Sequence, residues 1–229
     1  MNAVLENFDL VLKAFGYTVF LFLVSAVISL VLGTLLAAFR VSPVAVLRLF
    51  GGAYVTLIRN TPLVIIFLFF QLGAGKIFDW ARFGWVDIHI GQFDFTSFFT
   101  AAVASLSLYT AAFVCEALRA GVNAVGLGQA EAARAIGLPF SGVMAQVVLP
   151  QAFRASVPPL ASTFIALLKN TSVAGVFGVI EAAGRMKGFN NDYADQRWGI
   201  FLAFAIGYII LVELVSAVAI VLERRWKVA

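Results

Sequence analysis

The sequence has few charged residues, one cysteine and one histidine in 229 positions. Charged residues make up 12% of the chain, against about 25% in an average soluble domain, while 62% of residues are apolar. So little charge cannot cover a globular surface, which excludes a soluble enzyme, a disordered regulator and a nucleic-acid-binding protein. A single cysteine, Cys115, excludes an internal disulfide, and His89 has no Cys or His neighbour for a metal site. The composition predicts a membrane protein.

Five stretches are long and apolar enough to cross a bilayer. A helix needs roughly 20 apolar residues to span a hydrocarbon core about 30 Å thick. Stretches of this length with at most one charged residue predict spans at 14–39, 49–75, 95–117, 155–180 and 198–222. No internal repeat or linker divides the chain. We therefore expect an all-α integral membrane protein whose residues 1–229 form a single domain with five transmembrane helices.

The first expected span carries one face of small side chains. Ser25, Ser29, Gly33 and Ala37 recur every four residues. In lipid, helices associate through close backbone approach, which small residues permit. We expect this face to pack against another helix.

Residues 135–153 are also uncharged, but we do not expect them to form a span. They contain glycines, prolines and glutamines, and lipid cannot satisfy the backbone groups that such residues free. We place the loop 118–154 outside the bilayer, with a short helix over 129–136, a stop at Gly137 and a second amphipathic piece that ends at Pro150. Two short helices joined at a glycine would form a compact, mostly apolar knob that fits a groove on a soluble partner.

Five spans place the two termini on opposite sides of the membrane. With a cytoplasmic C-terminus, the inner loops hold eight basic residues, namely Arg40, Arg48, Arg119, Arg134, Arg154, Arg224, Arg225 and Lys227. The outer segments then hold six, namely Lys13, Lys76, Arg82, Arg185, Lys187 and Arg197. The positive-inside rule favours this orientation, with the N-terminus outside. Glu181 then belongs to an outer segment.

Two polar clusters interrupt the expected spans. Arg59, Asn60 and Thr61 lie in the second span, and Lys169, Asn170, Thr171 and Ser172 lie in the fourth. Polar side chains at membrane depth are costly and tend to be functional, and these cations, amides and hydroxyls suit a solute that carries a carboxylate. Ser162, Lys169 and Ser172 share one helical face, which could line a wet path. The alternative is that Arg59 and Lys169 reach the headgroup layer with their long side chains.

Glu116 and Glu213 are the acidic residues of the expected spans. Glu116 lies three residues before Arg119, so the two share a helical face and can pair. A carrier driven by an ion or proton gradient would use Glu116 or Glu213 as its relay, although no inverted repeat of the kind common in such carriers is present. A membrane scaffold or sensor that uses the 118–154 loop only for docking is the second alternative.

The loop carries a motif with a defined spacing. It contains Glu131-Ala132-Ala133, then Gly137, then Val147, Leu149 and Pro150. This pattern resembles the cytoplasmic EAA-loop signature of permease subunits of binding-protein-dependent ABC transporters, with Val147 in place of the usual isoleucine. The stretches 39–48, 54–73, 107–139 and 167–181 resemble the polar amino acid subfamily of these permeases, which includes histidine, glutamine, glutamate and arginine permeases, and actinobacterial glutamate permeases in particular.

The resemblance implies a type I ABC importer permease of MetI-like fold in the bacterial plasma (inner) membrane, with its N-terminus outside. It implies an ABC ATPase dimer docked on Gln129 and the motif residues, a second permease that is identical or a sister chain, and an extracellular solute-binding protein. The solute would be a polar amino acid, either glutamate or a relative such as glutamine or aspartate. Its path would involve the two polar clusters and Glu116.

The sequence contains no phosphate-binding loop of the pattern G-x-x-x-x-G-K-[ST]. We therefore expect no catalytic residue and no cofactor on this chain. ATP and Mg would be bound, and ATP hydrolysed, by the partner ATPase.

Overall fold

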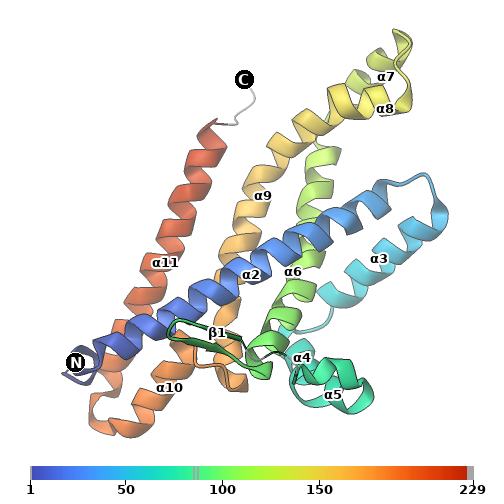
Figure 1. The fold of residues 1–229 in the computed structure, drawn as a ribbon. Helices are drawn as coiled ribbons and strands as arrows, with labels where there is room; N and C mark the ends of the chain where they lie inside the picture. Colours follow the sequence, from blue (N-terminus) through green and yellow to red (C-terminus); the bar gives the residue numbers. More distant parts are fainter. Residues whose placement is uncertain (1, 85, 87, 226–229) are drawn as a thin grey trace.

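The computed structural model describes residues 2–84, 86 and 88–225, and it is built from helices with one short hairpin (Figure 1). Lys227, one of the expected inner basic residues, lies outside the described residues. The first half contains α1 (Asn2–Glu6), α2 (Phe8–Val41), α3 (Ala45–Arg59), α4 (Leu63–Leu68), the π-helical η1 (Phe69–Gly73), α5 (Ala74–Ile77), the 3₁₀ turn η2 (Asp79–Arg82), β1 (Ile88–Ile90), β2 (Phe93–Phe95) and α6 (Ser97–Asn123).

The second half contains α7 (Leu127–Ala135), α8 (Phe140–Gly142), the π-helical η3 (Val143–Val148), α9 (Leu149–Asn170), the 3₁₀ segment η4 (Thr171–Phe177), α10 (Ala182–Asp192), η5 (Ala194–Gln196) and α11 (Arg197–Arg225). The predicted all-α class is confirmed.

Four helical segments are long and apolar enough to cross a membrane by themselves, namely Phe8–Val41, Ser97–Asn123, Phe140–Phe177 and Ala194–Arg225. The expected span 49–75 is instead a bent pair: Ala45–Arg59 and Leu63–Ile77 meet at 101°. The bend lies at Pro62, whose ring excludes the helical conformation from the residue before it and which has no N–H for the helix ladder. The second span is therefore broken where a continuous helix was expected.

The helix that contains the fourth expected span begins earlier than residue 155. Residues 140–154, which were placed outside the bilayer as a separate piece, continue through α8 and η3 directly into α9. Pro150 does not stop this helix: the segment before it is π-helical, and the chain continues from Pro150 as α9. Pro158 and Pro159 lie inside α9. The helix then tightens into a 3₁₀ segment after Asn170.

Helix α6 forms the centre of the bundle and packs against α2, α3, α4 and α9 (Figure 1). Ser25 and Ser29 on the small face of α2 are fully buried. A Cβ atom at Gly33 would overlap the Val114 side chain of α6. The small face therefore brings α2 into close contact with α6, as predicted.

Helix α11 is the least enclosed of the long helices. It packs against α9 and α10, and among its residues only Ile200 and Phe204 are buried. Its far end lies at the same end of the molecule as α7 and α8, whereas the N-terminus, α10 and α5 lie at the opposite end (Figure 1).

Candidate functional site

Helix α7 ends at a glycine-dependent turn. Gly137 adopts a φ of +90°, a conformation that other residues adopt only with strain. The Leu138 N–H donates to the Ala133 carbonyl oxygen at 3.2 Å, and the Gly137 N–H donates to the Arg134 carbonyl oxygen at 2.9 Å. This is the Schellman arrangement that closes a helix C-terminus. The predicted stop at Gly137 is therefore present in the structure.

The turn folds α7 back onto η3 and the start of α9. Ala133, Val143 and Val148 form a small buried cluster, and Val147 packs against it. The Gln151 side-chain amide donates to the Gln129 side-chain oxygen at 2.5 Å and to the Val147 carbonyl oxygen at 2.9 Å. We call this unit, residues 127–151, the knob. Its own core and hydrogen bonds attach it to α9 as a compact unit.

The knob presents an apolar surface at one end of the molecule. Leu127 and Ile136 are about four-fifths exposed, and Phe140 and Leu149 are also exposed. Of the motif residues, Glu131, Ala132, Gly137 and Pro150 are exposed, while Ala133 is buried and Val147 is partly buried. Large exposed apolar surfaces are typical of sites that contact another protein or a membrane.

Glu116 lies at the centre of an ionic cluster that joins three helices. Arg40 of α2 binds its Oε1 through Nη1. Arg59 Nη1 of α3 and Arg119 Nη2 of α6 each lie 3.4 Å from Glu116 Oε2. The predicted pair with Arg119 is present, but Arg40, 76 residues away in sequence, has no local signal that sequence reasoning could use.

Arg59 also contacts an aromatic ring. Its guanidinium carbon lies 5.8 Å from the centre of the Phe113 ring of α6, within the range of a cation–π interaction. Thr61, two residues later, donates its hydroxyl to the Leu57 carbonyl oxygen at 2.8 Å and so caps the end of α3. Asn60 is exposed at the break. The Arg59 guanidinium therefore contacts both the Glu116 carboxylate and the Phe113 ring.

A cavity of about 250 Å³ opens between α6 and α9 beside this ring. Its polar lining comes from Tyr109, Thr110, Ser162, Thr163 and Asn170. Phe113 also lines it, so the ring that contacts Arg59 forms part of its wall. We call this the α6–α9 cavity.

Lys169 and Ser172 line a second cavity, of about 390 Å³, between the end of α9 and α11. Tyr208, Ile209, Val212 and Glu213 of α11 complete its lining. The structure thus separates Ser162 from Lys169, although seven residues of helix keep them on one face, because they lie about 10 Å apart along α9 and meet different neighbours. Thr171 is buried and donates its hydroxyl to the Leu168 carbonyl oxygen at 2.6 Å. The polar residues of the fourth expected span therefore divide between two cavities.

Glu181, which the sequence places on an outer segment, is completely buried in the structure. Its Oε2 accepts hydrogen bonds from the Tyr208 hydroxyl at 2.6 Å and the Thr18 hydroxyl at 3.2 Å. Its Oε1 accepts from the Gly184 N–H at 2.8 Å, so that Glu181 caps α10. Burial raises the pKa of the Glu181 carboxyl above its ordinary value, against the opposing effect of these donors. The only sequence signal was an acid directly before a short helical stretch.

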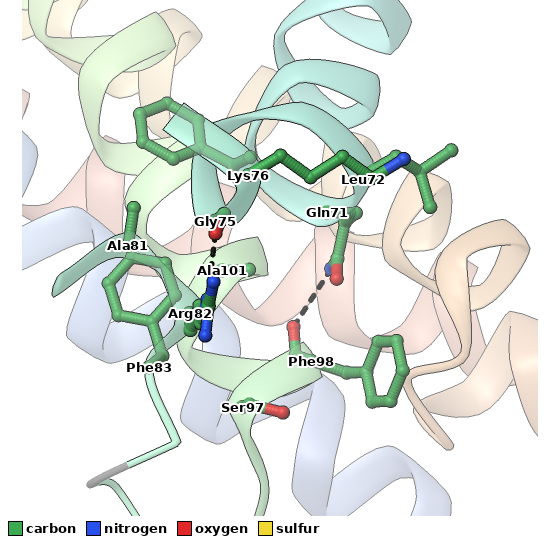
Figure 2. Close-up of a pocket in the computed structure, with 11 residues that line it drawn as sticks. Gln71, Leu72, Gly75, Lys76, Ala81, Arg82, Phe83, Ser97, Phe98 and Ala101 are labelled. Carbon is green, nitrogen blue, oxygen red and sulfur yellow. Dashed lines mark hydrogen bonds between the residues drawn. The ribbon is translucent and has the colours of Figure 1, made fainter. Parts of the chain in front are cut away.

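A further cavity of about 250 Å³ lies where α5 and η2 meet α6 (Figure 2). The Arg82 Nε donates to the Gly75 carbonyl oxygen at 2.8 Å, and Arg82 Nη2 lies 3.1 Å from Asp79 Oδ1. The Gln71 amide donates to the Phe98 carbonyl oxygen at 2.9 Å. These groups hold the turn after the broken span against α6.

Comparisons with known proteins agree on one kind of transporter component. Residues 29–228 match the family described as "binding-protein-dependent transport system inner membrane component". The chain is 42% identical, over 87% of its length and 86% of the relative's, to the glutamate transport system permease protein GluC of Corynebacterium efficiens.

Two solved structures have the same fold. An amino acid ABC transporter crystallised with histidines aligns over 97% of this chain and 96% of its own, with a TM-score of 0.83 and 25% identity. The MetNI methionine ABC transporter in an inward-facing conformation aligns over 96% of this chain and 98% of its own, with a TM-score of 0.75 and 20% identity. The predicted MetI-like importer permease fold is confirmed.

Proposed function

The chain belongs to the family of binding-protein-dependent transport system inner membrane components, and on this premise we propose that it carries glutamate or a close relative such as glutamine or aspartate. It is a multi-pass inner-membrane permease subunit of an importer for a polar amino acid. The 42% identity to a glutamate transport permease supports glutamate as the solute.

We place the ATPase contact on the knob. The observation that carries this assignment is the exposed apolar surface around Leu127, Ile136 and Phe140, on both sides of the turn at Gly137. Such a surface fits a groove on a soluble subunit. The ATPase would be a dimer that binds ATP and Mg, and its closure would reach the bundle through the continuous helix that follows the knob. Glu131, Ala132 and Gly137 would make the contact.

An ATPase on the knob sets the orientation. The knob and the last turn of α11 lie at one end of the molecule, which would then be cytoplasmic, and the N-terminus lies at the other end (Figure 1). The opposite end, with α5, α10 and the β1–β2 hairpin, would receive an extracellular solute-binding protein. This orientation agrees with the positive-inside count of the loops.

The solute path would include Arg59 and the α6–α9 cavity. The Arg59 side chain is 46% exposed, so its guanidinium is accessible to a carboxylate as well as to Glu116. The hydroxyl and amide groups of Tyr109, Thr163 and Asn170 line the cavity beside it, and groups of this kind orient a small polar ligand.

Purification with partners and reconstitution test this function. The tagged chain, extracted from native membranes in mild detergent, should bring down an ATPase with a phosphate-binding loop, and proteoliposomes of that complex with the binding protein should accumulate glutamate only when ATP is supplied. A chain that purifies alone and transports without ATP, driven by an ion gradient, would overturn the proposal. A complex without solute flux would identify a scaffold.

The Gly137→Asp variant tests the knob. The substitution forces a side chain onto a φ of +90°, a strain of about 1–3 kcal/mol, and adds charge to the contact surface. ATP-dependent uptake should fall sharply while membrane insertion persists. Gly91→Asp is the matched control, because Gly91 also has a positive φ, +59°, and open space around it, but it lies in the hairpin at the other end. Equal loss in both variants would contradict the assignment.

A further inference from the structure

A third cavity lies between the end of α2, the end of α6 and the knob. Its volume is about 490 Å³, within the range of about 300–1,000 Å³ that is typical of pockets for organic ligands. We call it the α2–knob cavity. Its wall is mostly apolar and includes Val41 of α2, Val122 of α6, Phe140 and Met144 of the knob, and Phe153 of α9. Nothing described so far occupies this space.

The α2–knob cavity offers water few hydrogen-bond partners. The Thr34 hydroxyl donates to the Leu30 carbonyl oxygen at 2.7 Å, and the Ser156 hydroxyl donates to the Ala152 carbonyl oxygen at 2.7 Å. Both donors are thus used within their own helices, whereas an ordered water needs about two to four polar partners. An empty apolar cavity also loses the dispersion contacts of its wall. The lining therefore favours an apolar occupant.

One cation belongs to this apolar wall. Among the lining residues that the structure describes, Arg119 alone is charged. Its Nη2 lies 3.4 Å from Glu116 Oε2, and its side chain is 38% exposed. Its Nε is buried and has no hydrogen-bond acceptor within the described part of the chain. A guanidinium has five N–H donors, so Arg119 retains donors for an anion that enters the cavity.

The surroundings of Arg119 carry an excess of positive charge. The guanidinium groups of Arg40, Arg59 and Arg119 share the single carboxylate of Glu116. Three positive charges against one negative charge leave an excess of two. Because no acidic residue is found among the described residues that line the cavity, this excess favours a ligand with a negative group.

The α2–knob cavity extends from the level of the headgroups into the hydrocarbon layer. Arg40 follows the uncharged stretch 14–39. Arg48 lies beside the link after α2, where its Nη1 donates to the Ser42 carbonyl oxygen at 3.0 Å. Ser42 lines the cavity at this level, and Thr34 lines it about 12 Å farther along α2, at 1.5 Å per residue. A ligand in this cavity therefore meets basic side chains at one level and acyl chains at the other.

We infer that the α2–knob cavity binds an anionic phospholipid, with one acyl chain between α2 and the knob and the phosphate group on Arg119. Basic pockets between membrane helices at the cytoplasmic side are suited to anionic lipid headgroups, and Arg48 adds attraction at the membrane surface. Because Phe140 and Met144 form part of the wall, the lipid takes part in the packing of the knob against α2. The assignment to the cytoplasmic leaflet rests on the proposed orientation, whereas the site itself does not.

Photolabelling of the assembled complex in vesicles tests the place of the lipid. A phosphatidylglycerol probe with a diazirine in one acyl chain should label the peptide that contains Met144. Ala38→Trp should abolish this labelling, because Ala38 is exposed and lines the cavity, so that an indole there occupies the space. Ala45→Trp is the matched control, since Ala45 is also exposed, at the first position of α3, but does not line the cavity. Unchanged labelling in Ala38→Trp, or equal loss in both variants, would overturn the inference.

Charge variants test the phosphate contact. Native mass spectrometry of the complex, titrated with phosphatidylglycerol and phosphatidylcholine of the same acyl chains, measures both affinities. Arg119→Gln should weaken phosphatidylglycerol binding by about tenfold, or about 1.4 kcal/mol, as expected for the loss of a charged hydrogen bond. It should leave phosphatidylcholine binding unchanged, and Arg119→Lys should restore part of the loss.

The charge variants have a matched control and a defined failure. Glu116 keeps Arg40 and Arg59 as partners in Arg119→Gln, so the ionic cluster persists. Arg154→Gln is the control, because Arg154 is exposed near the start of α9 and does not line the cavity. Equal wild-type affinities for the two lipids, or equal losses in Arg119→Gln and Arg154→Gln, would contradict the phosphate contact and reject the inference.

Other occupants of the cavity give different results. Labelling that appears only after the ATPase is removed would show that a segment of the ATPase fills the cavity, and it would reject the lipid. Displacement of the probe by inorganic phosphate would identify a site for the free anion and would reject it as well. Neither measurement depends on solute flux. A complex that binds the lipid at this site but does not transport glutamate would therefore reject only the transport proposal.

Discussion

The Tyr208 hydroxyl donates a hydrogen bond of 2.6 Å to the buried carboxylate of Glu181. Thr18 of α2 donates to the same oxygen at 3.2 Å and accepts from the Ala182 N–H at 3.1 Å. One carboxylate therefore joins α2, α10 and α11, and Tyr208 also lines the cavity that contains Lys169 and Glu213. This junction fixes the position of α11, a helix with few buried contacts of its own.

Tyr208→Phe should destabilise the protein by about 1–3 kcal/mol, because it removes one donor from a buried carboxylate and keeps the ring. Thermal unfolding in detergent measures the change. Tyr193→Phe is the control, since the Tyr193 hydroxyl accepts a long hydrogen bond of 3.4 Å from the Asn7 side-chain amide. A melting temperature for Tyr208→Phe equal to that of the control would show that the Glu181 junction contributes little.

The stability of the protein should depend on pH through Glu181. Burial raises the pKa of this carboxyl from its ordinary value of 4.5, so the folded state binds the proton more tightly than the unfolded chain does. The resulting stabilisation is present in full below the unfolded-state pKa and is lost as the pH rises through the folded-state pKa. Melting temperatures of wild type and Glu181→Gln, measured upward from pH 4.5, should therefore show the wild type losing stability relative to the variant. A constant difference would contradict this prediction.

Gly121→Ala should separate α6 from α9 beside the knob. A Cβ atom at Gly121 would overlap the Ser156 hydroxyl and the Ala152 carbonyl oxygen of α9, and overpacking of this kind costs about 1–3 kcal/mol. Gly52→Ala is the control, because Gly52 lies in α3 with open space around it, and alanine there should change stability by no more than about 1 kcal/mol. Unfolding temperature and ATP-dependent uptake should both fall only for Gly121→Ala.

The arginines around Glu116 should differ in their importance for stability. The Arg40 side chain is 20% exposed and the Arg59 side chain is 46% exposed. Arg40→Ala should therefore cost about 1.5–3 kcal/mol, as expected for the loss of a charged hydrogen bond, and Arg59→Ala less than about 1 kcal/mol. Unfolding in detergent measures both, and equal losses would refute the ranking. If Arg59 lies in the solute path, Arg59→Ala should instead show its main effect on uptake.

Local features of the fold were predictable from the sequence, and long-range contacts were not. The long apolar stretches of the sequence located the helices, and the glycine at position 137 located the turn that ends α7. Both features depend on residues close together in the chain. Pro62 marks the position of the break in the sequence. The angle of 101° between the two helices, however, depends on how they pack against the rest of the bundle. The burial of Glu181 and the contact of Arg40 with Glu116 join residues far apart in sequence. The two cavities divide the fourth-span cluster because successive residues of a helix point in different directions, so that Asn170 lines the α6–α9 cavity and Lys169 lines the cavity beside α11.

Pro158 and Pro159 give α9 a point of low bending stiffness. Neither residue has an N–H, so the carbonyl groups of Arg154 and Ala155 lack their usual helical donors, and two successive ladder bonds are missing. This weak point lies between the knob and the cavity-lining residues of α9, from Ser162 to Asn170. If the knob tilts, α9 would therefore not move as one rigid helix. Such a tilt would rotate residues 160–170 of α9 about the position of Pro158 and Pro159.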